Sequence, residues 1–186
     1  MVTIGALWLP ILLSSIAVWV ASALFWMVSP HHKSDYVRFP DEDGVRRALA
    51  AQRLVPGQYS IPYSVSAKDL EDPETVSKFE DGPVGIFTVA PSGVPAMGSK
   101  VAQSFLFYLL ISTVVAYMTS RTLDPGADYL AVFRVAGTMA WLAYGTATVP
   151  DAIWFGRPWS GIVKGLLDAL VYGLLTAGFF GWLWLA

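Results

Sequence analysis

Long apolar runs separated by polar stretches dominate the hydrophobic pattern of this chain. A helix needs about 20 apolar residues to cross the hydrocarbon core of a bilayer. Four runs meet this length, so we expect transmembrane helices near residues 4–28, 101–120, 127–149 and 161–186. The first two carry no charge, whereas the third contains Arg134 and the fourth contains Lys164 and Asp168.

The ends of two of these runs carry further signals. Ala21-Ser22-Ala23 has the form of a signal-peptide cleavage site, but no positive residue precedes the run, and the run is longer than the usual apolar region of a signal peptide. We therefore interpret the first run as a membrane anchor. The motif LDPGADY, residues 123–129, predicts that the third span begins with Pro125 in its first helical position.

The polar stretch between the first two runs has the turn residues of a small folded insert. It predicts a helix, a strand, a second helix begun by Asp72 and Pro73 and ended by Gly82, and a second strand. The first helix and the two strands are expected at Asp43–Leu54, Gln58–Tyr63 and Val84–Ala90. A short parallel crossover would join the strands. The insert is too small for a large core, so we expect it to lean on the membrane surface or on a partner.

The whole pattern predicts an all-α transmembrane fold, a four-helix membrane bundle with a small α/β extramembrane insert between helices 1 and 2. Residues 1–29 form the first helix, 30–100 the insert, and 101–186 the other three helices. Positive residues near the span ends lie mostly in the insert and around the 150–160 loop. Because such residues favour the cytoplasmic side, we place both loops in the cytoplasm and both termini outside.

Composition narrows the classes of function. Of 186 residues, 55% are hydrophobic and 14% are charged, and the net charge of −2 offers no basic surface for nucleic acid. Cysteine is absent, which excludes disulfides, thiolate zinc sites, iron–sulfur clusters and cysteine nucleophiles. The only two histidines are adjacent, so a haem held between two facing helices is excluded. We expect no cofactor.

Small residues recur every fourth position in the last span. This ridge comprises Gly161, Gly165, Ala169, Gly173, Ala177 and Gly181. Such ridges let a second helix backbone approach closely within a membrane. A ridge of this length predicts contacts with more neighbours than three short helices provide.

A polar ridge runs beside the small one and raises the question of what Asp168 binds. A carboxylate facing lipid would cost about 3 kcal/mol or more, so Asp168 should face the bundle interior. Lys164 lies one helical turn away, and Arg134 on the third span is the alternative cation. Further polar side chains of this interior are expected at Tyr108, Ser112, Thr138 and Tyr172. They form either a path for an ion or small solute, or polar contacts that hold the helices together.

Two motifs next to the spans offer candidate binding groups. In SPHHKSDY, His31, His32 and Asp35 are conceivable metal ligands, although adjacent histidines usually point apart, and a polar stop after the first helix explains them as well. In IWFGRPW, Arg157 lies between Trp154 and Trp159. This group either contacts a lipid phosphate or a partner, or serves as an ordinary interfacial anchor.

Six phrases together carry a resemblance to a known group. They are WLPILLSS, HHKSDY, PGQYSIP, GPVGIFTV, GADYLAVFRVAGT and IWFGRPW. Over nearly its whole length the chain resembles an uncharacterised family of small bacterial four-helix inner-membrane proteins. The resemblance implies a bacterial cytoplasmic membrane, four helices and one cytoplasmic insert, and it implies no activity.

Three functional hypotheses follow. The first is a non-enzymatic accessory or assembly subunit that docks on a larger membrane complex through the small-residue ridge, with membrane lipid, other subunits or copies of itself as partners. The second is a small oligomeric transporter or channel that uses Asp168, Arg134 and Tyr172. The third is a lipid-acting membrane enzyme with the two histidines and Asp35 as its acid, base or metal ligands. No GxSxG, Walker-type or HExxH motif is present.

Overall fold

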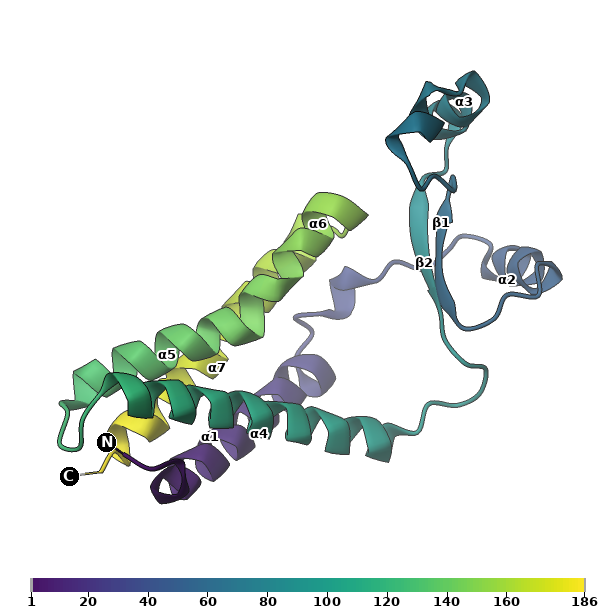
Figure 1. Cartoon of the computed structure of the whole chain (residues 1–186). Helices are drawn as coiled ribbons and strands as arrows, with labels where there is room; N and C mark the ends of the chain where they lie inside the picture. Colours follow the sequence, from purple (N-terminus) through teal and green to yellow (C-terminus); the bar gives the residue numbers. More distant parts are fainter. Residues whose placement is uncertain (1, 186) are drawn as a thin grey trace. The chain divides into compact units, whose positions relative to one another are not determined.

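The computed structural model describes residues 2–185, which divide into two compact units. A helical unit takes in the residues up to Tyr36, Ala96–Ile153 and the residues from Arg157 onward. An insert unit takes in Val37–Pro95 with Trp154–Gly156. Each is described by itself below, and Figure 1 shows the elements of both.

Helices build the whole of the helical unit. They are α1 (Trp8–Ala23), α4 (Met97–Thr122), α5 (Tyr129–Gly145), α6 (Val149–Phe155) and α7 (Trp159–Trp182). A 3₁₀ turn, Ile4–Leu7, precedes α1 and a π-helical turn, Leu24–Val28, follows it. Among residues 2–185, three helices are long and apolar enough to cross a membrane: Ile4–Val28, Met97–Thr122 and Trp159–Trp182. This finding indicates a membrane protein.

The third predicted span is divided into two α-helices. Helix α5 has 17 residues and passes through a 3₁₀ turn, Thr146–Thr148, into α6. The predicted start at Pro125 is wrong, because α5 begins at Tyr129. Pro125 precedes Gly126, whose φ of 77° is a left-handed conformation that no helical turn accommodates. The amide of Gly126 instead donates to the carbonyl of Leu185 at 2.8 Å.

Helix α5 runs alongside α7, and α1 contacts both α4 and α7 (Figure 1). The α5–α7 contact is close because glycines face each other across it. A Cβ added to Gly137 would lie 2.9 Å from Ala177 Cβ, and one added to Gly173 would lie 3.0 Å from the Gly137 carbonyl oxygen. Backbones this close gain van der Waals contact, the main attraction between helices in lipid.

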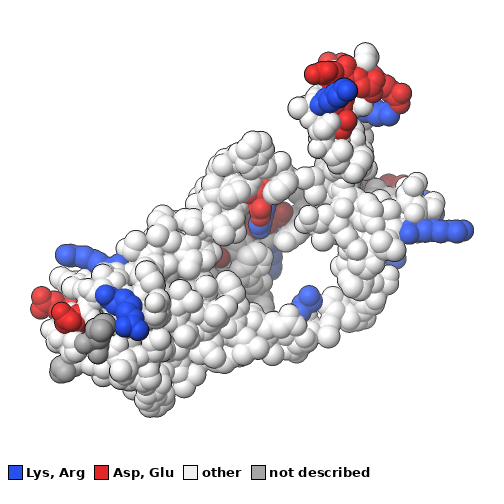
Figure 2. All heavy atoms as spheres, in the orientation of Figure 1, with Lys and Arg blue, Asp and Glu red and all other residues white. Residues whose placement is uncertain are grey.

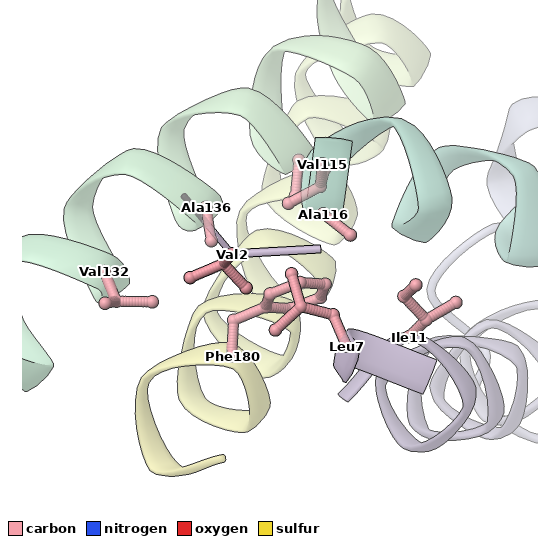
Figure 3. Packing of buried hydrophobic residues seen from close by; sticks show 9 residues of the cluster. Val2, Leu7, Ile11, Val115, Ala116, Val132, Ala136 and Phe180 are labelled. Atoms are coloured by element: carbon pink, nitrogen blue, oxygen red, sulfur yellow. The ribbon is translucent and has the colours of Figure 1, made fainter. Parts of the chain in front are cut away.

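An apolar cluster fills one end of the bundle. Figure 3 shows Phe180 and Leu7 pointing toward one another among aliphatic side chains from four segments. Both side chains are fully buried. The cluster comprises Val2, Leu7, Ile11, Val115, Ala116, Val132, Ala136, Ala140 and Phe180. Its packing leaves this end of the bundle interior dry and apolar.

Buried hydroxyl groups occupy the interior beyond this cluster. Ser14 and Thr176 donate to backbone carbonyls one turn back, at 2.6 and 2.8 Å. Ser14 also donates to the Ser112 hydroxyl at 3.1 Å, which joins α1 to α4. These bonds satisfy the hydroxyls within the protein, as expected of polar contacts that hold helices together.

The insert contains α2 (Glu42–Ala51), β1 (Gly57–Ile61), α3 (Pro73–Asp81) and β2 (Gly85–Val89). The predicted order of elements is confirmed, but the predicted parallel crossover is wrong. The strands are antiparallel, with Gly57 opposite Val89 and Ile61 opposite Gly85. An isolated two-stranded ribbon favours antiparallel pairing, whose hydrogen bonds run perpendicular to the strands, whereas parallel sheets need cover on both faces.

Capping explains the helix limits in the insert. Helix α3 is bounded as predicted, since the Asp72 side chain accepts from the Thr75 amide at 3.0 Å and Gly82 has a φ of 63°. Helix α2 is shorter than predicted. It ends at Ala51, and Arg53 adopts a positive φ of 52° before Pro56. No residue from 37 to 95 is buried, so this unit has no core of its own.

Charge is distributed as the membrane interpretation requires. On the face drawn in Figure 2, the surface of the helical unit is largely free of charge between its ends, where Lys, Arg, Asp and Glu gather. Large apolar side chains such as Leu106, Leu110 and Leu174 are exposed along its helices. In water such a surface would associate or aggregate, whereas in a bilayer lipid covers it.

Candidate metal centre

Both histidines lie against one carboxylate in the third turn of α7. The Nε2 atom of His32 is 2.7 Å from Asp168 Oδ2, and the Nε2 atom of His31 is 3.3 Å from Asp168 Oδ1. The side chains of His32 and Asp168 are each 6% exposed. Adjacent histidines thus converge, where the sequence led us to expect that they would point apart.

A second layer of side chains holds His32 from behind. Its Nδ1 atom is 2.6 Å from Asp35 Oδ2. The ammonium group of Lys164 donates to Asp35 Oδ1 at 2.6 Å and to the Ser34 hydroxyl at 2.7 Å. A carboxylate behind a histidine fixes the ring orientation and its tautomer, as in many metal sites.

The chain reaches this geometry through an irregular end to the first span. The π-helical turn Leu24–Val28 closes with the Ser29 amide donating to the Leu24 carbonyl at 2.8 Å, and Pro30 then prevents further helix. The Ser29 hydroxyl accepts from the His31 amide at 3.1 Å. The Trp26 ring stacks on His32, with 3.8 Å between centroids and 7° between planes.

The contacts of His32 restrict its protonation state. Both of its nitrogens face carboxylate oxygens, yet a neutral imidazole carries only one N–H. Three states satisfy both contacts. In the first, the ring is an imidazolium that donates to Asp35 and Asp168. In the second, the neutral ring donates from Nδ1 to Asp35, and a cation lies between Nε2 and Asp168. In the third, the neutral ring donates to Asp35 and accepts from a protonated Asp168.

The surroundings shift the pKa values of His32 and Asp35, which both lie outside the spans, in opposite directions. Burial lowers the pKa of His32, but the hydrogen bonds and charges of Asp168 and Asp35 outweigh burial and raise it above the ordinary value of 6.5. Hydrogen bonds from Lys164 and then from His32 hold the pKa of Asp35 below its ordinary value of 3.8. Asp35 therefore stays an ionised acceptor behind His32 across the neutral range.

The donor set fits a divalent transition-metal ion. One atom from each of His31, His32 and Asp168 lies within 4.8 Å of the others. In a tetrahedral zinc site with bonds of about 2.0–2.1 Å, ligand atoms lie roughly 3.3 Å apart, so small side-chain movements suffice. Two imidazoles and one carboxylate are a set typical of catalytic and other open zinc sites, which leave a fourth position.

A pocket of about 150 Å³ opens beside these ligands. The rings of three tyrosines meet there in edge-to-face contacts, with centroids 5.7–6.2 Å apart. The hydroxyls of Tyr144 and Tyr172 are buried; that of Tyr144 interacts with Ser112 and Thr176, whereas that of Tyr172 has no hydrogen-bond partner among residues 2–185. The lining residues are Trp26, His32, Tyr108, Tyr144, Thr148, Arg157, Gly161, Ile162, Gly165, Asp168 and Tyr172.

Neither Arg134 nor Lys164, the two cations expected beside Asp168, pairs with it in the structure. The predicted pair of Arg134 with Asp168 is wrong, because Arg134 is exposed on α5 and lines a separate groove with Thr138 and Trp141. Lys164 does not pair with Asp168 either, since it binds Asp35 and Ser34. Arg134 lies one turn and a half into α5, where a long side chain extends outward to the interface.

The small-residue ridge of α7 serves two purposes. Ala169, Gly173, Ala177 and Gly181 pack against α5, where Gly145, Gly137 and Tyr129 receive them. Gly161 and Gly165 line the pocket instead, and a Cβ added to Gly165 meets nothing within 4 Å. The expectation that the ridge needs neighbours outside the chain is therefore not supported, because α5 fills most of it.

The remaining candidate residues lie near the pocket or at the surface. Arg157 lines the pocket and is 3.5 Å from Asp151, whereas Trp154 and Trp159 are exposed. Tyr108 and Tyr172 share the pocket with Asp168, and Ser112 lies deeper, bonded to Ser14. Sequence reasoning therefore found most of the polar residues but did not bring the histidines to Asp168.

One signal in the sequence pointed to this contact. His31 and His32 follow the end of the first span, and Asp168 lies near the start of the last span. In a four-span bundle the first and last spans are antiparallel, so the end of one and the start of the other lie at the same membrane surface. Trp26 gave no such signal, because stacking on His32 depends on the π-helical turn. No family model, curated protein or solved structure matches the chain.

Proposed function

We propose that this protein is a four-span integral membrane protein that binds a divalent transition-metal ion of the zinc class at one membrane surface. His31, His32 and Asp168 are the protein ligands, and Asp35 with Lys164 orients His32. The observation that carries the proposal is the convergence of both histidines on a buried carboxylate, with a second carboxylate behind one of them.

The fourth span of this proposal is α5 with its continuation through α6. The packing of α5 on α7 from Ala169 to Gly181 supports it, since α7 is itself long and apolar enough to cross a bilayer. The orientation derived from Lys and Arg then puts the metal site, the insert and the α6–α7 junction at the cytoplasmic face of a bacterial inner membrane.

Two of the three functional hypotheses drawn from the sequence, the accessory subunit and the transporter, stay predictions with less support. Docking on a larger complex was motivated by the ridge of α7, which packs mostly on α5. A transport path through Asp168, Arg134 and Tyr172 is disfavoured by the exposure of Arg134 and by the apolar cluster around Phe180. A site that opens at one end of the bundle fits these observations better than a path through it.

Cobalt(II) substitution tests the metal proposal directly. Protein purified in a nonionic detergent should bind one equivalent of Co²⁺, with the intense visible absorption of a four-coordinate site, and Zn²⁺ should displace it. Asp168→Asn and the double variant His31→Ala, His32→Ala should lower the affinity at least a hundredfold. Asp128→Asn, which changes a carboxylate at the other end of the bundle, is the matched control.

Folding of each variant is checked by its elution as a single species in size-exclusion chromatography. Wild-type protein that binds no more cobalt than Asp168→Asn would overturn the proposal. The cluster would then be an ion-paired contact in which His32 is an imidazolium between Asp35 and Asp168.

A further inference from the structure

We propose that the pocket beside the metal ligands binds a phosphate-type oxyanion, which supplies the fourth ligand of the ion. This inference rests on the proposed metal function. Its structural basis is the Arg157 guanidinium and the unpartnered Tyr172 hydroxyl, which line the same small pocket.

One buried phenol of the pocket lacks an acceptor. Tyr172 is 7% exposed, and its hydroxyl has no partner among the described residues, whereas the Tyr144 hydroxyl interacts with Ser112 and Thr176. A buried hydroxyl without a partner costs stability, and native proteins rarely tolerate one. An oxyanion in the pocket would offer an acceptor oxygen to Tyr172.

Arg157 supplies a positive charge to the pocket that His32 and Asp168 also line. Its contact with Asp151 is 3.5 Å long between half-exposed side chains, so it leaves most of the five guanidinium N–H donors available. Guanidinium groups bind phosphate oxygens through paired N–H donors. The Asp168 carboxylate would repel an anion by itself, but a bound divalent ion reverses the local charge.

Two of the three metal ligands also belong to the pocket. His32 and Asp168 line it, so an ion held by them would lie at the pocket wall. A three-ligand zinc site leaves one position for an outside oxygen. An oxyanion in the pocket would be placed to fill that position.

The pocket is large enough for a phosphate group. Its volume of about 150 Å³ compares with roughly 10–15 Å³ for one water molecule on the same measure. The absence of side chains at Gly161 and Gly165 keeps this space open, since a Cβ at Gly165 has no neighbour within 4 Å.

Free phosphate and a phospholipid headgroup share this chemistry. The experiment uses the cobalt-loaded protein in nonionic detergent and follows the visible Co²⁺ spectrum. One arm titrates sodium phosphate. A second arm adds phosphatidic acid in mixed micelles, with diacylglycerol as the lipid that lacks phosphate.

Saturable spectral change in either arm is the expected result, and the arm that responds identifies the source. Arg157→Gln should raise the apparent Kd about tenfold, the loss typical of one charge-assisted contact. Gly165→Leu, which fills the pocket, should abolish the response. Arg134→Gln and Gly178→Leu, placed on the outer faces of α5 and α7, are matched controls and should respond as wild type does.

The experiment can overturn the oxyanion pocket without overturning the metal site. If cobalt binds but neither phosphate nor phosphatidic acid changes its spectrum, the pocket assignment is overturned and the metal function stands. If both anions act equally in wild type and Gly165→Leu, they reach the ion by another route, and the assignment is also overturned. Absence of cobalt binding in wild type overturns both.

Discussion

Asp168 lies in the third turn of α7 with each carboxylate oxygen next to an imidazole nitrogen. A carboxylate at the centre of a membrane helix costs about 3 kcal/mol on insertion scales, and one near the helix start costs less. Here the histidines and, as we propose, a metal ion compensate that cost. The conflict between an apolar helix and its one acid is therefore resolved by residues that follow a different span.

The support behind His32 gives a prediction at this scale. Asp35→Asn keeps the size of the side chain but removes the charge that Lys164 and His32 share. We expect the affinity for Co²⁺ to fall about 10- to 100-fold, as with other carboxylates behind metal-binding histidines. Isothermal titration calorimetry measures it, with Asp128→Asn as control. Unchanged affinity would show that Asp35 does not orient the ring.

At the scale of elements, the contact between α5 and α7 depends on glycine. A Cβ at Gly173 would lie 3.0 Å from the Gly137 carbonyl and 3.1 Å from Trp141 Cβ, whereas one at Gly178 meets nothing within 4 Å. Both positions are in the same helix. Comparing the same substitution at Gly173 and at Gly178 therefore separates the effect of crowding from the effect of helix propensity.

We predict that Gly173→Ala destabilises the bundle relative to Gly178→Ala. Both substitutions gain the helix propensity of alanine, so their difference reports overpacking, which costs about 1–3 kcal/mol. Unfolding in mixed detergent micelles, followed by circular dichroism, gives the two free energies. Equal stability of the two variants would mean that α5 does not approach α7 at Gly173.

In the insert, helix α3 depends on the ionised Asp72 side chain, which accepts from the Thr75 hydroxyl and amide at 2.8 and 3.0 Å. These bonds lower the pKa of Asp72 below the ordinary value of 3.8. A carboxylate whose pKa is lower in the folded state stabilises the fold above the ordinary pKa. That contribution is lost as the pH falls through the folded-state pKa.

We therefore predict that the start of α3 frays below about pH 4, since the ordinary pKa of aspartate is near 3.9. The protection factor of the Thr75 amide, its hydrogen-exchange rate corrected for the intrinsic pH dependence of exchange, should fall there in the wild-type protein. In Asp72→Ala the same amide should exchange fast already at neutral pH. An amide that is equally protected in both proteins would exclude capping by Asp72.

At the scale of the whole molecule, the main prediction concerns the number of spans. The absence of cysteine permits single-cysteine labelling at Val94, Thr122 and Ser160. If α5 crosses the membrane, Thr122→Cys should be labelled from the outside of intact cells. Val94→Cys and Ser160→Cys should be labelled only after the membrane is opened. Labelling of Thr122→Cys and Ser160→Cys from one side would rule out a spanning α5.

The linear pattern was sufficient for the elements of this protein. Apolar runs predicted the long helices, because each helix in lipid must satisfy its own backbone and show an apolar surface. Asp72, Pro73 and Gly82 predicted the limits of α3, because capping acts within one turn. The small-residue ridge of α7 predicted a closely packed neighbouring helix, and the spacing of its residues in the sequence showed how long the ridge is.

Only the tertiary structure decided which residues meet. Arg134 and Asp168 match in charge, but their helix faces point apart, and no local pattern reveals the rotation of one helix about another. The histidines reach Asp168 because a π-helical turn and Pro30 redirect the chain, and adjacent residues give no periodic signal. The antiparallel strands likewise depend on partners distant in sequence. Local chemistry determines elements, whereas contacts between distant residues form the candidate metal centre and its pocket.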